Sequence, residues 1–549
     1  MKNDIDIARS IPLHPIEEIA TKAGLHEGEY ICLGNFKAKV SLDVLTRLKH
    51  HKQGKLILVT TINPTPSGEG KTTVTIGLAQ SLAQLGKKTM LAIREPSMGP
   101  IMGKKGGATG GGYAQVLPME DINLHFTGDM HAITSAHNLL ASLLDNHIHH
   151  GDLFHIDPRF IVWPRVLDIS DRSLRKVVVG LGGPSDGVPH EIEFAITPAS
   201  EIMAILCLCK DIMDLKQRLS RIIVAYTYDN KPVTALDLKA VGAMTVLLKD
   251  AIMPNLVQTI EGVPAFVHGG PFANIAHGTN SLIADLMGLR LADYFVTEAG
   301  FGSELGAEKF FDIVCRTGNL TPDAVVLVVS VKALKRHGEG TGLTALQKGL
   351  LNLEKHLENI SWFQVPVIVA INQFTGDSDE ELDCIEQFCS THQVPSAIVD
   401  VWAKGGEGGI ELAGKLISLM HNTPSRFTYL YDLDLPLKTK IEIIAKKMYG
   451  AERVGYSVNA ESDIKLCMDL GLDRLPICIA KTPYSLSDDP SLLGRPTGFK
   501  ITVRDIRFSA GAGFLVPMTG KITTMPGLPP KPQSEHMDID KNGNIIGLS

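Results

Sequence analysis

The chain has 549 residues, enough for three or four domains of roughly 150 residues each. Hydrophobic residues make up 44% and charged residues 21%, a globular composition that excludes a disordered chain. The net charge of −7 argues against a nucleic-acid binder, which carries a basic excess. No apolar run approaches the ~18 residues of a membrane span, and acidic residues near the N-terminus do not suit a secretory signal. The eight cysteines form no CxxC pair, so we expect a cytoplasmic protein with free thiols.

The first 55 residues or so look helical and polar, and a strand–helix–strand pattern follows them. The apolar run Leu56 to Ile62 predicts a strand buried on both faces. Apolar residues at three- and four-residue spacing from Val74 to Leu85 then predict a helix that ends near Gly86. The next run, TMLAI, predicts a second strand. Such a βαβ unit implies a parallel sheet.

Further strand candidates follow along the chain, and they set our expected domain boundaries. The alternation of strands and helices is interrupted from about Gly103 to Ile169, and we expect it to resume near Val177. The later candidates are Arg221 to Thr227, Tyr294 to Gly300, Ala324 to Ser330 and Val365 to Phe374, before a Pro/Gly-rich, poorly regular end. We expect a multidomain α/β protein: a P-loop NTPase-like parallel-sheet domain (1–105 and 221–364), an inserted subdomain (106–220) and a C-terminal α/β region (365–549).

The strongest local signal is TPSGEGKTT, which lies between the first strand and its helix. Backbone N–H groups of such a loop surround phosphates, while Lys71 would neutralise the β- and γ-phosphates and Thr72 would ligate Mg²⁺. The usual pattern opens with glycine, whereas this one opens with Thr65; a glycine-rich turn that binds nothing is the alternative. A partitioning-type ATPase is disfavoured, because Pro66 stands where that class has a second lysine. The predicted ATP-binding residues are Thr65, Pro66, Ser67, Gly68, Glu69, Gly70, Lys71 and Thr72.

We expect two charged residues at strand ends to lie beside this loop. In open parallel sheets, ligands bind beyond the carboxyl ends of the strands, and Arg94 directly follows TMLAI. Its alternative is a surface ion pair with Glu95. Glu298 ends another strand in the manner of a residue that organises Mg²⁺, or else it caps the next turn. Histidines at six-residue spacing from His125 fit no helical ligand pair, so we predict no metal there.

From these motifs the chain resembles the formate–tetrahydrofolate ligase family. The resemblance covers the phosphate loop, Arg94 to Leu140, Val296 to Arg316, the strand VPVIVAINQF and Val401 to Gly409, blocks that extend over most of the chain. It implies ATP-dependent joining of formate to N10 of tetrahydrofolate, giving 10-formyltetrahydrofolate, ADP and phosphate through formyl phosphate. It also implies a homotetramer activated by K⁺ or NH₄⁺.

The resemblance further assigns roles to single residues. Arg94 becomes the formate and formyl-phosphate residue, and its planar fork suits a carboxylate better than a lysine would. Phe374 and Trp402 become the two rings that clamp the pterin by stacking, although each would otherwise be read as a core residue. Two other classes stay open: an ATP-switch protein that ignores formate and folate, and a folate-binding module with a vestigial phosphate loop.

Overall fold

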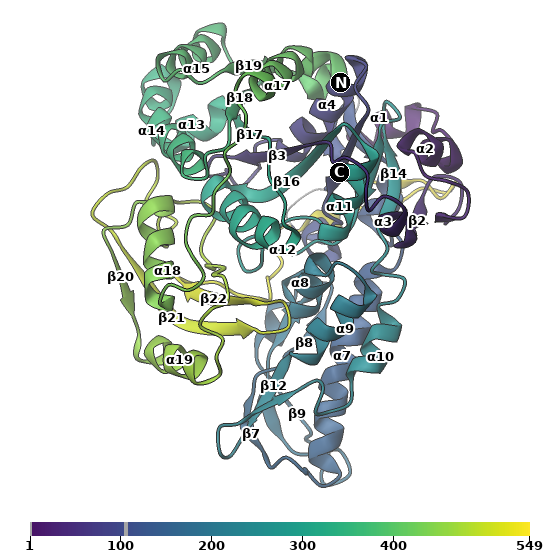
Figure 1. Cartoon of the computed structure of the whole chain (residues 1–549), viewed down its shortest axis with the longest axis vertical. Coiled ribbons are helices and arrows are strands. Elements are labelled where there is room, and N and C mark those ends of the chain that lie inside the picture. The colour runs from purple at the N-terminus through teal and green to yellow at the C-terminus, as the bar shows by residue number, and fades with distance from the viewer. Residues whose placement is uncertain (1–2, 104–107, 549) are drawn as a thin grey trace.

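The computed structural model describes residues 3–103 and 108–548, and its centre is one large, mostly parallel sheet (Figure 1). From β15 to β19 all neighbouring strands run parallel, and β14, β2 and β1 extend the sheet antiparallel at one edge. The order is β1 (Tyr30–Cys32), β2 (Ala38–Val40), β14 (Asn255–Thr259), β15 (Pro264–Val267), β4 (Thr89–Ile93), β16 (Tyr294–Gly302), β3 (Lys55–Thr61), β17 (Ala324–Val329), β18 (Val367–Asn372) and β19 (Ser396–Val399). The α/β class is confirmed.

The central sheet separates two hydrophobic cores, one on each face, because successive side chains of a strand point to opposite faces. In β3, Leu56 and Leu58 point into one core, while Ile57 and Val59 point into the other. Helices α4 (Lys71–Gln84) and α17 (Ile410–Asn422) cover the second layer; α11 (Leu282–Leu291) and α14 (Gly342–Ser361) cover the first. Successive strand side chains face opposite sides, so a run of apolar residues can bury both faces.

The predicted βαβ unit is present, with one strand added between its two halves. Strand β3, helix α4 and strand β4 follow in the expected order, but β16 lies between β3 and β4 and pairs with both. This crossover brings the carboxyl ends of three strands together at one rim.

Several sequence expectations were wrong in detail. The first 55 residues contain the two short strands β1 and β2 besides helices; β2 is buried and pairs with β14, and β1 pairs with β2 at the sheet edge. The alternation of parallel strands and helices does not resume at Val177. Instead, β9 (Val177–Val179) pairs antiparallel with β10 (His190–Ile192). Likewise β12 (Ile223–Thr227) belongs to a small antiparallel sheet with β7 (Ile156–Ile161) and β13 (Pro232–Thr234). Local β-propensity predicts these strands but not their partners.

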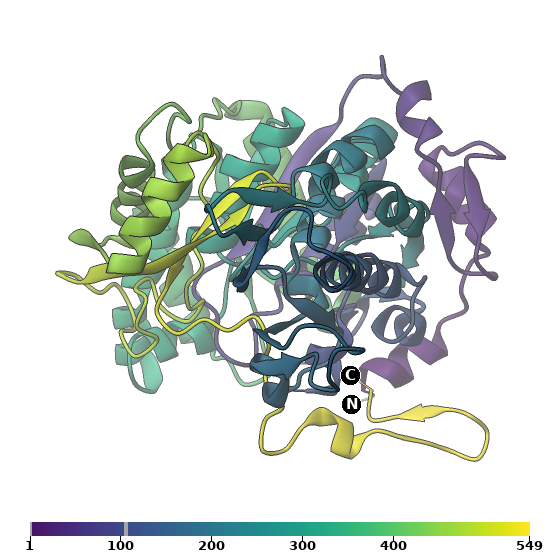
Figure 2. The same ribbon diagram turned by 90° about the horizontal axis from the view of Figure 1, so that it is seen from below.

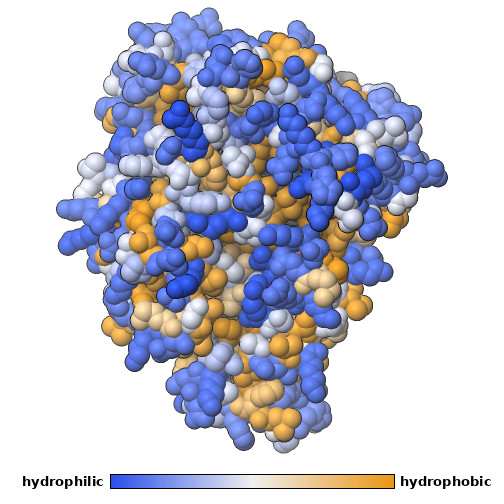
Figure 3. Space-filling view, viewed as in Figure 1, coloured by the Kyte–Doolittle hydropathy of each residue, from blue (hydrophilic) through white to orange (hydrophobic). Residues whose placement is uncertain are grey.

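The lower lobe in Figure 1 holds this small sheet beside α7 (Asp129–His149), α8 (Glu201–Leu208), α9 (Ile212–Ser220) and α10 (Val241–Leu247). On the face shown in Figure 3, apolar side chains also reach the surface toward the lower end of the molecule. No helix among residues 3–103 and 108–548 has the length and apolar character needed to span a membrane.

The C-terminal region is more regular than its composition suggests. Strands β21 (Lys500–Ser509) and β22 (Phe514–Thr519) form an antiparallel pair, with β20 (Arg453–Tyr456) parallel to β21. Helices α18 (Leu437–Ile444) and α19 (Val458–Asp469) accompany them. The last residues then return to the N-terminal helix α1 (Asp4–Ser10), so that the two ends lie close together (Figure 2).

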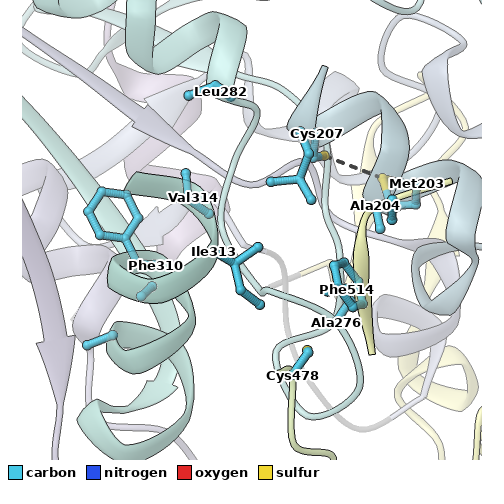
Figure 4. Packing of buried hydrophobic residues seen from close by; sticks show 14 of the residues in the cluster. Met203, Ala204, Cys207, Ala276, Leu282, Phe310, Ile313, Val314, Cys478 and Phe514 are labelled. Atoms are coloured by element: carbon cyan, nitrogen blue, oxygen red, sulfur yellow. Dashed lines mark hydrogen bonds between the residues drawn. The ribbon is translucent and has the colours of Figure 1, made fainter. Parts of the chain in front are cut away.

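One continuous core joins these parts. Figure 4 shows Met203 and Cys207 of α8 near Ala276, Ile313 and the C-terminal Phe514. The domain boundaries remain predictions, and the one at 105/106 lies outside the described residues. The sheet itself continues across the boundary predicted at 364/365, since β18 pairs with β17.

The contact between α4 and α16 (Val401–Lys404) gives a stability prediction. A Cβ added at Gly77 of α4 would lie 2.4 Å from Cβ of Val401, closer than atoms can approach. We expect Gly77→Ala to lower the free energy of unfolding by about 1–3 kcal/mol through overpacking, measured by urea denaturation. Gly414→Ala in α17 is the control, because nothing lies within 4 Å of its added Cβ. Equal losses in both variants would contradict the close approach.

Candidate active site

The phosphate loop joins the end of β3 to the start of α4. Gly70 precedes the helix with a φ of +71°, a left-handed conformation that suits glycine. A Cβ there would also lie 2.3 Å from Nδ2 of Asn372, so the close approach requires glycine as well. The first N–H groups of α4 point out of the helix end, which favours anions. The loop therefore has the geometry of a phosphate site.

A buried carboxylate lies beneath this loop. Glu298 of β16 forms an ion pair with Lys71, and Oγ1 of Thr72 donates to its Oε2 at 2.8 Å. The other carboxylate oxygen of Glu298, Oε1, lies 3.6 Å from Nη2 of Arg94. The side chain of Glu298 is only 3% exposed, whereas that of Arg94 is 26% exposed. Two cations and a hydroxyl thus converge on one carboxylate. Glu298 does not end its strand as expected: β16 continues to Gly302, and Glu298 stands just after the last residue that pairs with β4.

The charges around Glu298 decide its ionisation. Burial alone would raise the pKa of this carboxyl, because it disfavours the charged form. The positive charges of Lys71 and Arg94, together with the hydrogen bonds from Lys71 and Thr72, outweigh burial and hold the pKa below its ordinary value. Glu298 is therefore an anion at neutral pH, and it keeps the two cations in place.

Arg94 leaves β4 at its carboxyl end and lies against the backbone of β16. A Cβ added at Gly300 would be 2.9 Å from Nη1 of Arg94, so glycine permits the guanidinium to lie this close. Nε of Arg94 is buried and has no hydrogen-bond partner among the described residues. A guanidinium with unused donors beside a phosphate loop is suited to gripping a small carboxylate.

The two aromatic residues follow neighbouring strands, β18 and β19, but differ in environment. Phe374 follows the end of β18, is 43% exposed, and its Cζ would lie 3.7 Å from a Cβ at Gly70. Trp402 in α16 is half-buried, and its indole packs on the turn at Gly111 and Gly112. Phe374 thus borders the phosphate loop with an accessible ring, while part of the Trp402 surface already contacts protein.

The residues predicted at the site fall into two groups. The first group surrounds the carboxylate of Glu298: Lys71 and Thr72 bond to it, and Arg94 lies 3.6 Å from it. Of the two rings, Phe374 borders the loop at Gly70, and Trp402 packs on the turn at Gly111 and Gly112. A separate cleft of about 1080 Å³ lies between the lower lobe and the C-terminal region, lined by residues such as Phe160, Trp163 and Arg507, and none of the predicted site residues lines it.

Sequence reasoning missed three polar residues that hold the phosphate loop. Asn372, the last residue of β18, donates from Nδ2 to the carbonyl oxygen of Glu69 at 2.9 Å. Ser330 follows β17 and donates to the Glu69 carboxylate, and Nζ of Lys332 donates to Oγ of Ser67 at 2.7 Å. Asn372 and Ser330 stand at the carboxyl end of a buried parallel strand, the same signal that pointed to Arg94, and Lys332 lies in the first turn of the helix that follows β17, α13 (Val331–His337).

The oxygen donors beside the loop suit a magnesium ion. Mg²⁺ prefers oxygen ligands such as carboxylates, hydroxyls and phosphates, and it keeps several waters. The hydroxyl of Thr72 and the carboxylate of Glu298 already lie 2.8 Å apart at the mouth of the loop. Both oxygen donors could therefore bind a magnesium ion that is carried by a nucleotide.

Comparison with known families adds one finding. The family model described as formate–tetrahydrofolate ligase matches residues 2–549, which is essentially the whole chain.

The ion pairs of Glu298 predict a pH-dependent stability. We expect Glu298→Gln to lower the melting temperature at pH 7, since removing one partner of a buried pair costs about 3–5 kcal/mol. A carboxyl with a lowered pKa stabilises the fold above its unfolded value near 4.5 and loses that effect as the pH falls through its lower folded value. The difference between the two proteins should therefore shrink below pH 4.5. Exposed Glu27→Gln is the control; a Glu298→Gln protein that melts like wild type at pH 7 would refute the pairing.

Proposed function

The chain belongs to the formate–tetrahydrofolate ligase family, and on that premise we propose that Lys71, Thr72 and Arg94 carry out its chemistry around Glu298. Members of this family join formate to tetrahydrofolate at the expense of ATP. The observation that carries the proposal is the meeting of two cations and the phosphate loop on one buried carboxylate.

The proposed reaction has two steps. A formate oxygen attacks the γ-phosphorus of ATP, forming a P–O bond while the bond to the β-phosphate oxygen breaks and ADP leaves. N10 of tetrahydrofolate then attacks the formyl carbon, phosphate departs with its oxygen, and the nitrogen loses a proton. Formate is already ionised at neutral pH, so the first step needs no strong base. Its barrier is the approach of one anion to another.

The residues present address that barrier. Lys71 would exchange its partner Glu298 for the β- and γ-phosphates of ATP, with the loop N–H groups around them. Arg94 would hold formate, and then formyl phosphate, through a bidentate contact. A magnesium ion bound with ATP supplies further charge neutralisation, and Thr72 and Glu298 would hold it. The protein thus contributes mainly position and charge.

The remaining assignments are supported by membership of the family, and one of them also by the position of a side chain. We infer from it a homotetramer, activation by K⁺ or NH₄⁺, a cytoplasmic location, and stacking of the pterin between Phe374 and Trp402. The exposed ring of Phe374 beside the phosphate loop supports its part in this contact.

The activity test is formation of 10-formyltetrahydrofolate from ATP, formate and tetrahydrofolate by the purified chain, followed by absorbance of the acid-derived methenyl product. We expect each of the three substrates to be required. An ATP hydrolysis rate that ignores formate and folate would instead indicate an ATP-switch protein. Folate binding without any ATP binding would indicate a module with a vestigial loop.

Arg94 provides the sharpest substitution. Removing a bidentate, charge-assisted contact should cost about 2–4 kcal/mol of transition-state stabilisation, or roughly 30- to 1000-fold in kcat/KM for formate. We expect Arg94→Lys to fail as well, because a point charge cannot reproduce the planar fork. Affinity for MgATP should change little. Normal formate kinetics in Arg94→Lys would remove the residue from this role.

The aromatic residues predict a selective effect on folate. Loss of one stacking ring should weaken tetrahydrofolate binding about 5- to 150-fold, corresponding to roughly 1–3 kcal/mol. We expect Phe374→Ala to raise the KM for tetrahydrofolate with little change in melting temperature, since Phe374 is 43% exposed and lies outside the buried core. Trp402→Ala should raise the same KM and also lower the melting temperature, because its indole packs on Gly111 and Gly112.

The matched control is Trp362→Ala, which removes another exposed ring, 41% accessible, at the end of α14. It should leave the three KM values unchanged. If Phe374→Ala and Trp402→Ala lowered the melting temperature but left the folate KM at its wild-type value, both rings would be packing residues only.

A further inference from the structure

Glu69 stands in the middle of the phosphate loop, yet its side chain is buried between the start of that loop and the end of β17. The residue is only 3% exposed. Its Oε1 accepts the backbone N–H of Thr65 at 2.6 Å, and its Oε2 accepts the hydroxyl of Ser330. One side chain therefore links the beginning of the loop to its fifth residue, and it links the loop to the end of β17.

The backbone of the same residue makes a third link. Nδ2 of Asn372, at the end of β18, donates to the carbonyl oxygen of Glu69 at 2.9 Å. Residue 69 is thus held by groups from the loop itself and from the ends of β17 and β18, the next two strands beyond β3 in the sheet. Since strands are rigid elements, these contacts fix the loop on its scaffold.

The charge of Glu69 would be unfavourable without this arrangement. A carboxylate is an acceptor only and cannot donate a hydrogen bond to a phosphate oxygen. Burial raises the pKa of Glu69 above its ordinary value, and the hydrogen bonds from Ser330 and Thr65 and the nearby charge of Lys332 offset this only in part. Lys332 is exposed and bonds to Ser67 of the same loop. The carboxyl is directed into a set of donors rather than toward an incoming triphosphate.

We propose that Glu69 is a positioning residue, whose buried side chain closes the phosphate loop on itself and ties it to β17 before ATP arrives. The proposal rests on the proposed role of this loop in binding ATP. It differs from the sequence-based expectation, in which Glu69 binds the nucleotide as a member of the loop. Its consequence is that the loop needs little rearrangement on binding, so less affinity is lost to ordering.

The two oxygens of Glu69 suggest graded variants. Glu69→Ala removes both side-chain links, and Ser330→Ala removes one. Glu69→Gln keeps the shape: its amide oxygen can still accept from Thr65, and its amide N–H can donate to Ser330. If position matters, the glutamine variant should restore most of what alanine loses.

The control is a similar carboxyl elsewhere. Glu201 at the start of α8 accepts the backbone N–H groups of Gly511 and Ala512, at 2.7 and 3.2 Å. It therefore ties a turn to a rigid element as Glu69 does, but in the lower part of the molecule. Glu201→Ala should lower the melting temperature without changing nucleotide affinity.

The experiment is calorimetric titration of each full-length protein with MgADP, combined with KM values for ATP, formate and tetrahydrofolate. We expect Glu69→Ala to bind MgADP about 10- to 100-fold more weakly and Ser330→Ala about 3- to 10-fold more weakly. Glu69→Gln should stay within about threefold of wild type, and the KM values for formate and folate should not move. If Glu69→Ala does not fold, Ser330→Ala and Glu69→Gln decide the question.

The outcomes separate this inference from the proposed function. A wild-type chain that binds no MgADP would contradict the proposed function of the loop. If the wild-type chain binds MgADP and either Ser330→Ala or Glu69→Ala binds it with the same affinity, only the positioning role would be overturned. A Glu69→Gln protein as weak as Glu69→Ala would overturn it too, because the negative charge rather than the tie would then matter.

Discussion

The contact on which the site depends is the one between the buried carboxylate of Glu298 and the cations around it. Without Glu298, Lys71 and Arg94 would be two positive charges close together under a helix end that is itself positive. The carboxylate allows the protein to hold this concentration of positive charge before any substrate is present. It reaches the site only because β16 is inserted between β3 and β4, so three strand ends share one rim.

This arrangement explains how an anion can be joined to a polyanion. Preformed donors and charges cost no reorganisation when the reaction occurs, and they act most strongly where water is excluded. The ties of the loop to β17 and β18 serve the same end, because a fixed loop keeps its N–H groups aimed at one place. In the proposed reaction, position and charge rather than proton transfer are the means by which this site would promote attack of formate on ATP.

Much of this could be predicted from local sequence. The strand that ends at Thr61, the helix that begins at Lys71 and the strand TMLAI follow from patterns within about 40 residues. Non-local pairing could not be predicted: Val177 and Ile223 begin β-branched runs like those of the central sheet, but they join small antiparallel sheets instead. Membership of a loop also does not show where a side chain points: the sequence placed Glu69 among the ATP-binding residues, and in the structure its carboxylate accepts a hydrogen bond from Ser330.

The central claim is that Glu298 holds Lys71 only until a triphosphate takes its place. A crystal structure of the protein with Mg²⁺, a non-hydrolysable ATP analogue and formate tests it most directly. The account predicts that Nζ of Lys71 moves from Glu298 to the β- and γ-phosphates, while formate lies in the fork of Arg94 and Glu298 stays near Thr72. A nucleotide bound elsewhere, with Lys71 still paired to Glu298, would contradict the account.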